Sequence, residues 1–134
     1  MTIILCLDER GGMTFLGKRQ SRDERVIEDI IETVGRARLL VNSYSLPLFP
    51  ETVAISSDTP LDTAGDEDFC FVETDDPLPY LDKAYTLIVY NWNRHYPSDK
   101  RPALSPESHG FALRETTEFA GKSHEKITKE TYVK

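Results

Sequence analysis

The chain has 134 residues, the size of one domain. Hydrophobic residues make up 39% of it, which is enough to bury a single core and excludes disorder throughout. The 16 Lys and Arg residues against 23 Asp and Glu residues leave a net charge of −7, which argues against nucleic acid as a partner, because nucleic acid is bound mainly through its phosphates.

Two cysteines, Cys6 and Cys70, lie inside apolar stretches and are predicted to be small buried hydrophobes, not a disulfide or a zinc ligand set. Such thiols are typical of the reducing cytoplasm. The apolar segment 1–7 ends at charged residues and lacks the basic flank and cleavage site of a signal peptide. No run of about 18 apolar residues occurs, so we expect no membrane-spanning segment.

The first half of the chain predicts a strand, a loop and a helix. Residues 3–7 are continuously apolar, as in a strand buried on both faces of a parallel sheet. A long basic loop is expected over 9–21. Apolar residues at 26–34 recur at helical spacing, which predicts a helix that Ser21 caps and Gly35 ends.

The middle of the chain alternates short strands with connections, so the first strand, the helix and the next strand form a right-handed βαβ unit. We predict strands at 39–41, 52–56, 69–72 and 85–92. Between them we expect one or two helical turns within 42–50, a solvated acidic connection at 57–68 and a short helix begun by Asp75-Asp76-Pro77.

The last third is predicted to be a proline-containing loop at 93–109 followed by two strands, 111–116 and 127–133, that pair antiparallel around Ala120-Gly121. Hydrophobic periodicity therefore predicts one α/β domain over residues 1–134. Its central sheet is expected to be mostly parallel, with helices on both faces and a C-terminal antiparallel hairpin.

The histidines His95, His109 and His124 lie in predicted loops or turns without metal-ligand spacing, so no metal site is predicted. One remote alternative is a metal-free ribonuclease in which His95 and His124, with Lys122, supply an acid and a base. The simpler interpretation is that these histidines are solvated, and that the run from Lys122 to Lys126 is a solvated turn. No glycine-rich phosphate-binding motif occurs.

A basic cluster precedes the predicted helix: Lys18, Arg19, Arg22 and Arg25. Arginines at a helix N-terminus can bind anions. A solvated face paired with neighbouring carboxylates is the alternative, and both remain open.

The order of these segments resembles that of the dihydrofolate reductase family over nearly the whole chain. The resemblance lies in element order and apolar pattern. It is carried by five segments: Ile4 to Asp8 with Gly12-Met13, Arg22 to Val34 with Leu39 to Val41, Val53 to Ser57, Phe69 to Val72 through Tyr80 and Lys83 to Leu87, and Glu118-Phe119 through Tyr132.

The chain departs from that family's pattern at the positions of its site. The family's Leu-Pro-Trp before the helix is absent, and Asp23 is the nearest candidate for its acidic residue, which protonates the pterin. Its phosphate-gripping Gly-Arg-x-Thr becomes Asn-Ser-Tyr-Ser at 42–45. The resemblance thus implies cofactor contacts from Ser43 and Ser45, with Arg19 and Arg22 beside them.

The family's glycine pair after the later strand is replaced by Glu73-Thr74. A side chain there fills the space that a pyrophosphate needs, and its charge adds a repulsion on the order of a few kcal/mol. NADPH is therefore the cofactor that the resemblance implies but that these residues disfavour.

We expect a dihydrofolate-reductase-like domain that lacks standard NADPH-dependent reduction. It would bind a small anionic ligand or a protein at the mouth formed by residues 10–23 and 42–49. The alternative is a divergent NAD(P)H- or flavin-dependent reductase of a pterin-like or other small heterocycle, with Asp23 as proton donor. The ribonuclease ranks far below both.

Overall fold

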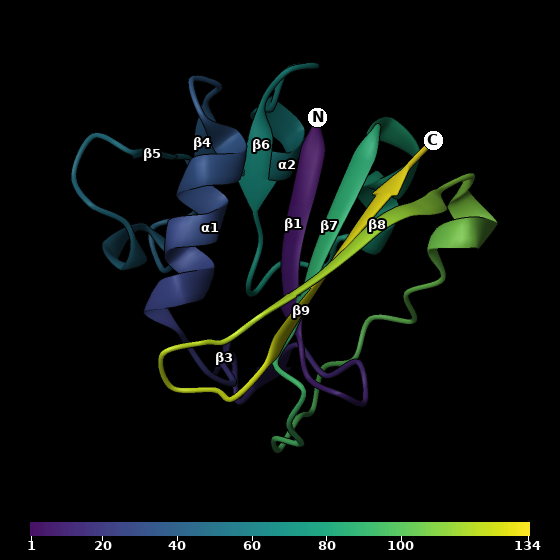
Figure 1. The fold of residues 1–134 in the computed structure, drawn as a ribbon. Helices are drawn as coiled ribbons and strands as arrows, with labels where there is room; N and C mark the ends of the chain where they lie inside the picture. Colours follow the sequence, from purple (N-terminus) through teal and green to yellow (C-terminus); the bar gives the residue numbers. More distant parts are fainter.

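The computed structural model describes residues 1–134 and contains one seven-stranded sheet (Figure 1). The five strands from β5 to β7 are parallel, and β9 runs antiparallel to both β7 and β8. This confirms the predicted mostly parallel sheet with its C-terminal hairpin. The order across the sheet is β5 (Ala54–Ser56), β4 (Leu39–Val41), β6 (Phe69–Phe71), β1 (Thr2–Leu7), β7 (Thr86–Asn91), β9 (Ile127–Val133) and β8 (Ala112–Phe119).

Helix α1 (Glu24–Val34) covers one face of the sheet. Its buried residues Val26, Ile30 and Val34 recur at helical spacing and lie in one apolar cluster with Ile4 of β1 and Ile88 of β7. The short 3-10 helix η1 (Leu46–Leu48) packs against the same cluster. The predicted amphipathic helix and the helical turn after β4 are thus confirmed.

The N-terminal cap of α1 is Asp23, so the predicted Ser21 cap is wrong. Asp23 has an extended backbone, and its carboxylate accepts the N–H of Arg25, whereas the Ser21 hydroxyl contacts His124. The Asp23 side chain reaches an N–H two residues ahead, as an N-cap does. Gly35 ends the helix with a φ of +57°, as predicted.

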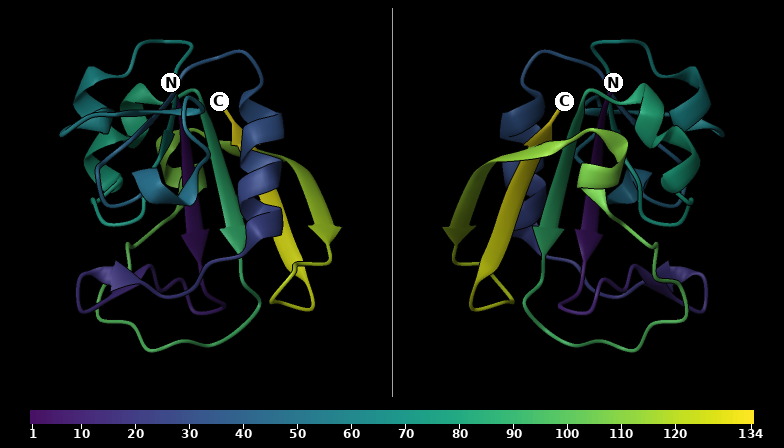
Figure 2. Two further views of the ribbon diagram at one scale, coloured as in Figure 1. Left: turned by 90° about the vertical axis from the view of Figure 1, so that its left-hand side faces the viewer. Right: turned by 90° about the vertical axis from the view of Figure 1, so that its right-hand side faces the viewer.

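The opposite face is covered by α2 (Pro60–Thr63), η2 (Leu78–Lys83) and the segment that includes η3 (Pro106–His109). Figure 2 shows α1 on one side of the sheet and the teal α2 and η2 on the other. Leu61 of α2 is buried, so the predicted fully solvated connection 57–68 is wrong at this turn. One turn is too short to show a helical period. The longest helix has 11 residues, too short to cross a membrane.

The predicted loop 9–21 contains a small hairpin, β2 (Thr14–Phe15) with β3 (Lys18–Arg19). Strands of two residues leave no alternation in the sequence, which is why they were not predicted. This segment, residues 92–101 and the turn 120–126 gather at the end of the sheet toward which the arrowheads of β1 and β7 point, at the bottom of both views in Figure 2.

We expect Ile30→Ala to destabilise the fold by about 2–5 kcal/mol, because Ile30 is fully buried between α1 and the sheet and its loss leaves a cavity. Urea unfolding followed by Trp92 fluorescence measures the change. The matched variant Ile55→Ala, on the edge strand β5 where Ile55 is 45% exposed, should change stability by less than about 1 kcal/mol. Equal losses in the two variants would contradict this placement of α1.

Candidate functional site

The crevice between β1 and β6 is the topological switch point of the sheet. From β1 the chain crosses by α1 to β4 on one side, whereas from β6 it crosses by η2 to β7 on the other. Open α/β sheets bind ligands at such a point, outside the carboxyl ends of the strands. Asp8 follows β1 and Glu73 follows β6, so two carboxylates lie beyond the carboxyl ends of the two strands that flank this crevice.

The Glu73 side chain is buried at the crevice and bound on both oxygens. Arg19 donates Nε to one oxygen at 2.8 Å and Nη2 to the other at 2.9 Å, and the Ser45 hydroxyl donates at 2.7 Å. The Arg19 guanidinium also stacks over the Tyr44 ring at 4.3 Å. Glu73 therefore occupies the crevice as a paired carboxylate. Both of its oxygens accept hydrogen bonds from Arg19, and one also accepts from Ser45, so these donors are not free for a ligand.

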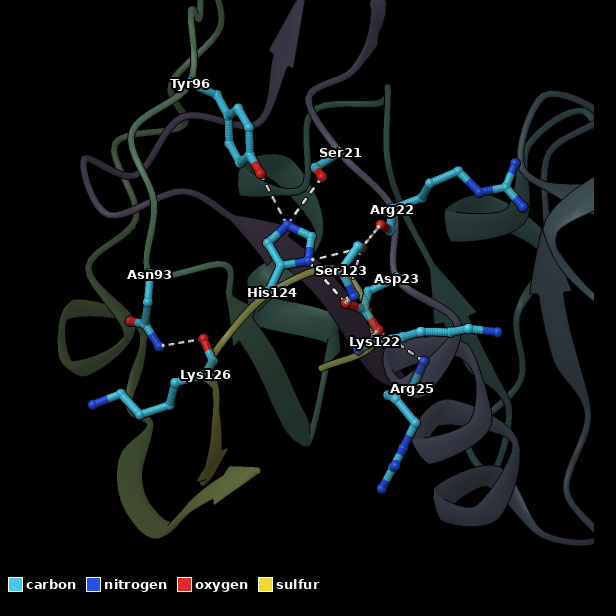
Figure 3. Close-up of polar contacts among 10 residues, drawn as sticks. All are labelled: Ser21, Arg22, Asp23, Arg25, Asn93, Tyr96, Lys122, Ser123, His124 and Lys126. Carbon is cyan, nitrogen blue, oxygen red and sulfur yellow. Dashed lines mark hydrogen bonds and ion pairs between the residues drawn. The ribbon is translucent and has the colours of Figure 1, made fainter. Parts of the chain in front are cut away.

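A second buried carboxylate, Asp23, joins the start of α1 to the turn between β8 and β9 (Figure 3). It accepts the N–H groups of Lys122 and Ser123, each at 2.9 Å, and Nδ1 of His124 at 2.8 Å. A Cβ on Gly121 would lie 2.6 Å from an Asp23 oxygen, so only glycine lets the turn approach this closely.

The His124 ring is held on all sides. Its Nε2 lies 3.0 Å from the Ser21 hydroxyl and 2.9 Å from the Tyr96 hydroxyl, which point to it from different loops in Figure 3. The ring stacks on Trp92 with centroids 4.7 Å apart and an interplanar angle of 22°. His124 is 4% exposed, so the prediction of a solvated turn histidine is wrong.

The electrostatics of this cluster keep Asp23 ionised. Burial alone would raise the pKa of the Asp23 carboxyl, but hydrogen bonds from the Lys122 N–H, the His124 ring and the Ser123 and Arg25 N–H groups hold that pKa well below its ordinary value. A carboxylate only accepts hydrogen bonds, so Nδ1 of His124 is the donor to Asp23, and in the neutral form of the ring Nε2 is an acceptor.

Two spaces adjoin the cluster. A gap of about 10 Å³ lies between Ser21, Asp23, Glu73 and Trp92. A cleft of about 230 Å³ lies outside it between α1 and η1, with an apolar wall of Ile27, Ile31, Leu48 and Pro50. Both spaces are lined in part by Arg22, Asp23, Ile27 and Leu48, so they are neighbours on one surface.

The structure brings some of the predicted site residues together and leaves others apart. Arg19 and Ser45 meet at Glu73. Arg22 and Asp23 line the same cleft, with Arg22 exposed and Asp23 buried. Ser43 is exposed and forms no hydrogen bond with Glu73 or Asp23. The proton-donor role of Asp23 and the cofactor contacts stay predictions, since the carboxylate and the Arg19 guanidinium face protein partners.

The two histidines of the ribonuclease alternative lie apart in the structure. His95 is exposed in the loop after β7 and forms no hydrogen bond with buried His124. No group of three or more His, Cys, Asp or Glu residues is placed to hold a metal. Cys70 is free and buried, and burial raises the pKa of its thiol to about 12, so it carries no thiolate at neutral pH.

Comparison with known proteins bears on the fold. Neither a protein-family model nor a curated protein matches the sequence. Among solved structures, dihydrofolate reductase from Enterococcus faecalis, complexed with NADP(H) and RAB-propyl, aligns over 98% of this chain and 94% of that chain with a TM-score of 0.69 and 11% sequence identity. The chain has the dihydrofolate reductase fold. The resemblance drawn from element order is thereby confirmed for the architecture, while function is decided by the site.

In this dihydrofolate-reductase-like chain we expect Glu73→Ala to lower the free energy of unfolding by about 2–3 kcal/mol. Removing one partner of a fully buried ion pair costs about 3–5 kcal/mol, and less is expected here because the Arg19 side chain is 21% exposed. Urea unfolding measures the loss. Glu67→Ala, at an exposed carboxylate without an ion pair, is the control and should be nearly neutral.

Asp23→Asn should destabilise the chain by about 2 kcal/mol at pH 7, because the variant loses the charge that its buried donors face. The folded pKa of Asp23 lies below the unfolded value of about 3.9, so its stabilisation is complete above that pH and is lost as the pH falls. Urea unfolding at pH 7 and pH 3 should show a shallower acid loss in Asp23→Asn than in the wild type or in the exposed-site variant Asp75→Asn. Parallel acid profiles would contradict the lowered pKa.

Proposed function

We propose that this chain is a dihydrofolate-reductase-like domain that binds a small anionic ligand at the cleft beside Arg22 and does not carry out NADPH-dependent reduction. The observation that carries the proposal is the buried Glu73 side chain at the switch point of the sheet. A dinucleotide held in the usual way outside parallel strands needs that space empty and its main-chain donors free.

Displacing Glu73 would break an ion pair that also orders the loops around it. Arg19 and Ser45, the residues expected to hold cofactor phosphates, both bind Glu73. Because Arg19 neutralises Glu73, the obstacle to a pyrophosphate is mainly the occupied space and the used donors, and charge repulsion is the smaller part.

The far side of the crevice is also unfavourable for phosphate groups. A cavity of about 310 Å³ between α2 and η2 is lined by four carboxylates: Asp58, Asp62, Asp75 and Asp76. A ligand phosphate beside them would meet like charges in a hollow that concentrates their field. An anionic cofactor that extended along this edge would therefore be repelled.

The cleft on the α1 side is lined by one arginine, Arg22, together with the carboxylates Asp23, Glu24 and Glu28. Arg22 is exposed on this cleft and forms no ion pair, whereas Glu24 is paired with Lys122 and Glu28 with Arg25. The apolar wall of the cleft lies beside the Arg22 guanidinium. A small carboxylate or phosphate with an apolar body fits this combination, because the guanidinium binds the anion and the wall covers the body.

A divergent reductase is the second candidate, because the solved dihydrofolate reductase with the same fold is complexed with NADP(H). The two candidates differ in one measurable property. A reductase must bind the nicotinamide nucleotide next to the strand ends, where Trp92, the single tryptophan, reports on binding.

We expect NADPH and NADH to leave the melting temperature and Trp92 fluorescence unchanged at millimolar concentration. A thermal-shift screen of small carboxylates and phosphates, with flavins, nucleotides and folates, should give a hit that stabilises the fold by about 2.7 kcal/mol at 100 times its Kd. For that hit, Arg22→Glu should weaken binding about tenfold or more, because it replaces the attracting charge.

Arg36→Glu is the matched control, since Arg36 is exposed beyond the C-terminal end of α1 and lies outside the cleft. Its affinity for the hit should equal that of the wild type. Saturable quenching of Trp92 by NADPH would favour the reductase. Equal affinity of Arg22→Glu and the wild type would place the anion site elsewhere.

A further inference from the structure

We propose that Ser21, His124 and Asp23 form a nucleophilic triad that hydrolyses small carboxylic esters. The Asp23 carboxylate lies 2.8 Å from Nδ1 of His124, and Nε2 of the same ring lies 3.0 Å from the Ser21 hydroxyl. The three side chains thus stand in the order of acid, base and nucleophile, as Figure 3 shows. This inference depends on the proposed function in one respect only, because the substrate would lie in the same cleft.

The roles of the two ring nitrogens follow from Asp23. The carboxylate is buried and accepts main-chain N–H groups of Arg25, Lys122 and Ser123 as well as the histidine ring. Asp23 stays an acceptor, so Nδ1 of His124 carries a proton, and in the neutral ring Nε2 presents its lone pair to Ser21. An imidazole held this way can take the proton of a serine hydroxyl as that hydroxyl attacks.

The Ser21 hydroxyl is not committed to the fold. His124 is its only hydrogen-bond partner in the protein. Tyr96 also directs its hydroxyl to Nε2, but a single lone pair accepts one strong hydrogen bond at a time. Tyr96 therefore competes with Ser21 for the base, and its removal would leave Ser21 as the sole partner of Nε2.

The proposed substrate cleft adjoins the gap that Ser21 lines. Ser21 is part-exposed and lines the small gap that adjoins the cleft between α1 and η1. The gap itself is too small for an acyl group, so a short apolar acyl group would lie in the cleft of about 230 Å³, on Ile27 and Leu48. The main-chain N–H groups of Arg22 and Asp23 follow Ser21 and donate to no other protein atom, so donors for a developing oxyanion are next to the nucleophile.

The reaction balances without a further reagent. The Ser21 oxygen bonds to the carbonyl carbon while its proton passes to Nε2 of His124. The ester C–O bond then breaks, and the alcohol leaves with that proton. Water repeats the attack on the acyl-serine, with Nε2 again taking and returning the proton, which releases the carboxylic acid and restores Ser21.

The test uses the full chain with p-nitrophenyl butyrate and, separately, an alkyl fluorophosphonate. We expect p-nitrophenolate release above the buffer rate, and one phosphonyl group on Ser21 by peptide mass spectrometry. Ser21→Ala should lose both, and His124→Gln should slow both about 100-fold or more, the usual contribution of a general base. Tyr96→Phe should keep both or accelerate them.

Ser56→Ala and His95→Gln, at exposed positions outside the cluster, are the matched controls and should react like the wild type. If His124→Gln does not fold, Ser21→Ala and Tyr96→Phe still decide the outcome. Absence of labelling in the wild type, or labelling and hydrolysis that persist in Ser21→Ala, would overturn the triad.

The failures of the two proposals are distinguishable. Normal anion binding at Arg22 with an unlabelled Ser21 would overturn the triad alone. A labelled Ser21 with no anion bound by the wild type would overturn the proposed function alone.

Discussion

Three carboxylates are buried at the carboxyl-terminal edge of the sheet, and each must be matched by donors. Asp8, Asp23 and Glu73 are at most 7% exposed. An unmatched buried charge costs several kcal/mol, so the edge is stable only if hydrogen-bond donors reach all three. The donors come from loop segments of the chain, chiefly 9–21 and 120–126. This requirement accounts for how closely these loops approach the strand ends.

The same requirement separates this site from the fold that carries it. The sheet order, the crossover helix and the closing hairpin are those of dihydrofolate reductase. The crevice, however, contains the Glu73–Arg19 ion pair, and the carboxylate at the start of α1 faces the chain's own His124. A scaffold can keep its core while its strand ends change, because the core depends on apolar burial and the site depends on a few polar contacts.

Much of the architecture was predictable from local pattern. The strand at 3–7 and the helix that ends at Gly35 both have a strong hydrophobic period, and both formed where expected. Two predictions that were wrong concern segments without such a signal. Helix α2 is only one turn long, so it shows no period. Ser21 and Asp23 are both good N-cap residues and lie two positions apart. Only the backbone conformation at Asp23 distinguishes them.

Of the candidate site, the sequence located Asp23, Arg19 and Ser45 near the strand ends, but not the protein groups that they contact there. It did not indicate that His124 is buried, because the turn around it is polar and charged. The amino-acid order by itself determined the α/β class and the apolar surfaces, since hydrophobic periodicity is a property of neighbouring residues. Only the tertiary structure decided which polar groups meet: His124 contacts a carboxylate 101 positions away, and chain spacing carries no information about such a pair.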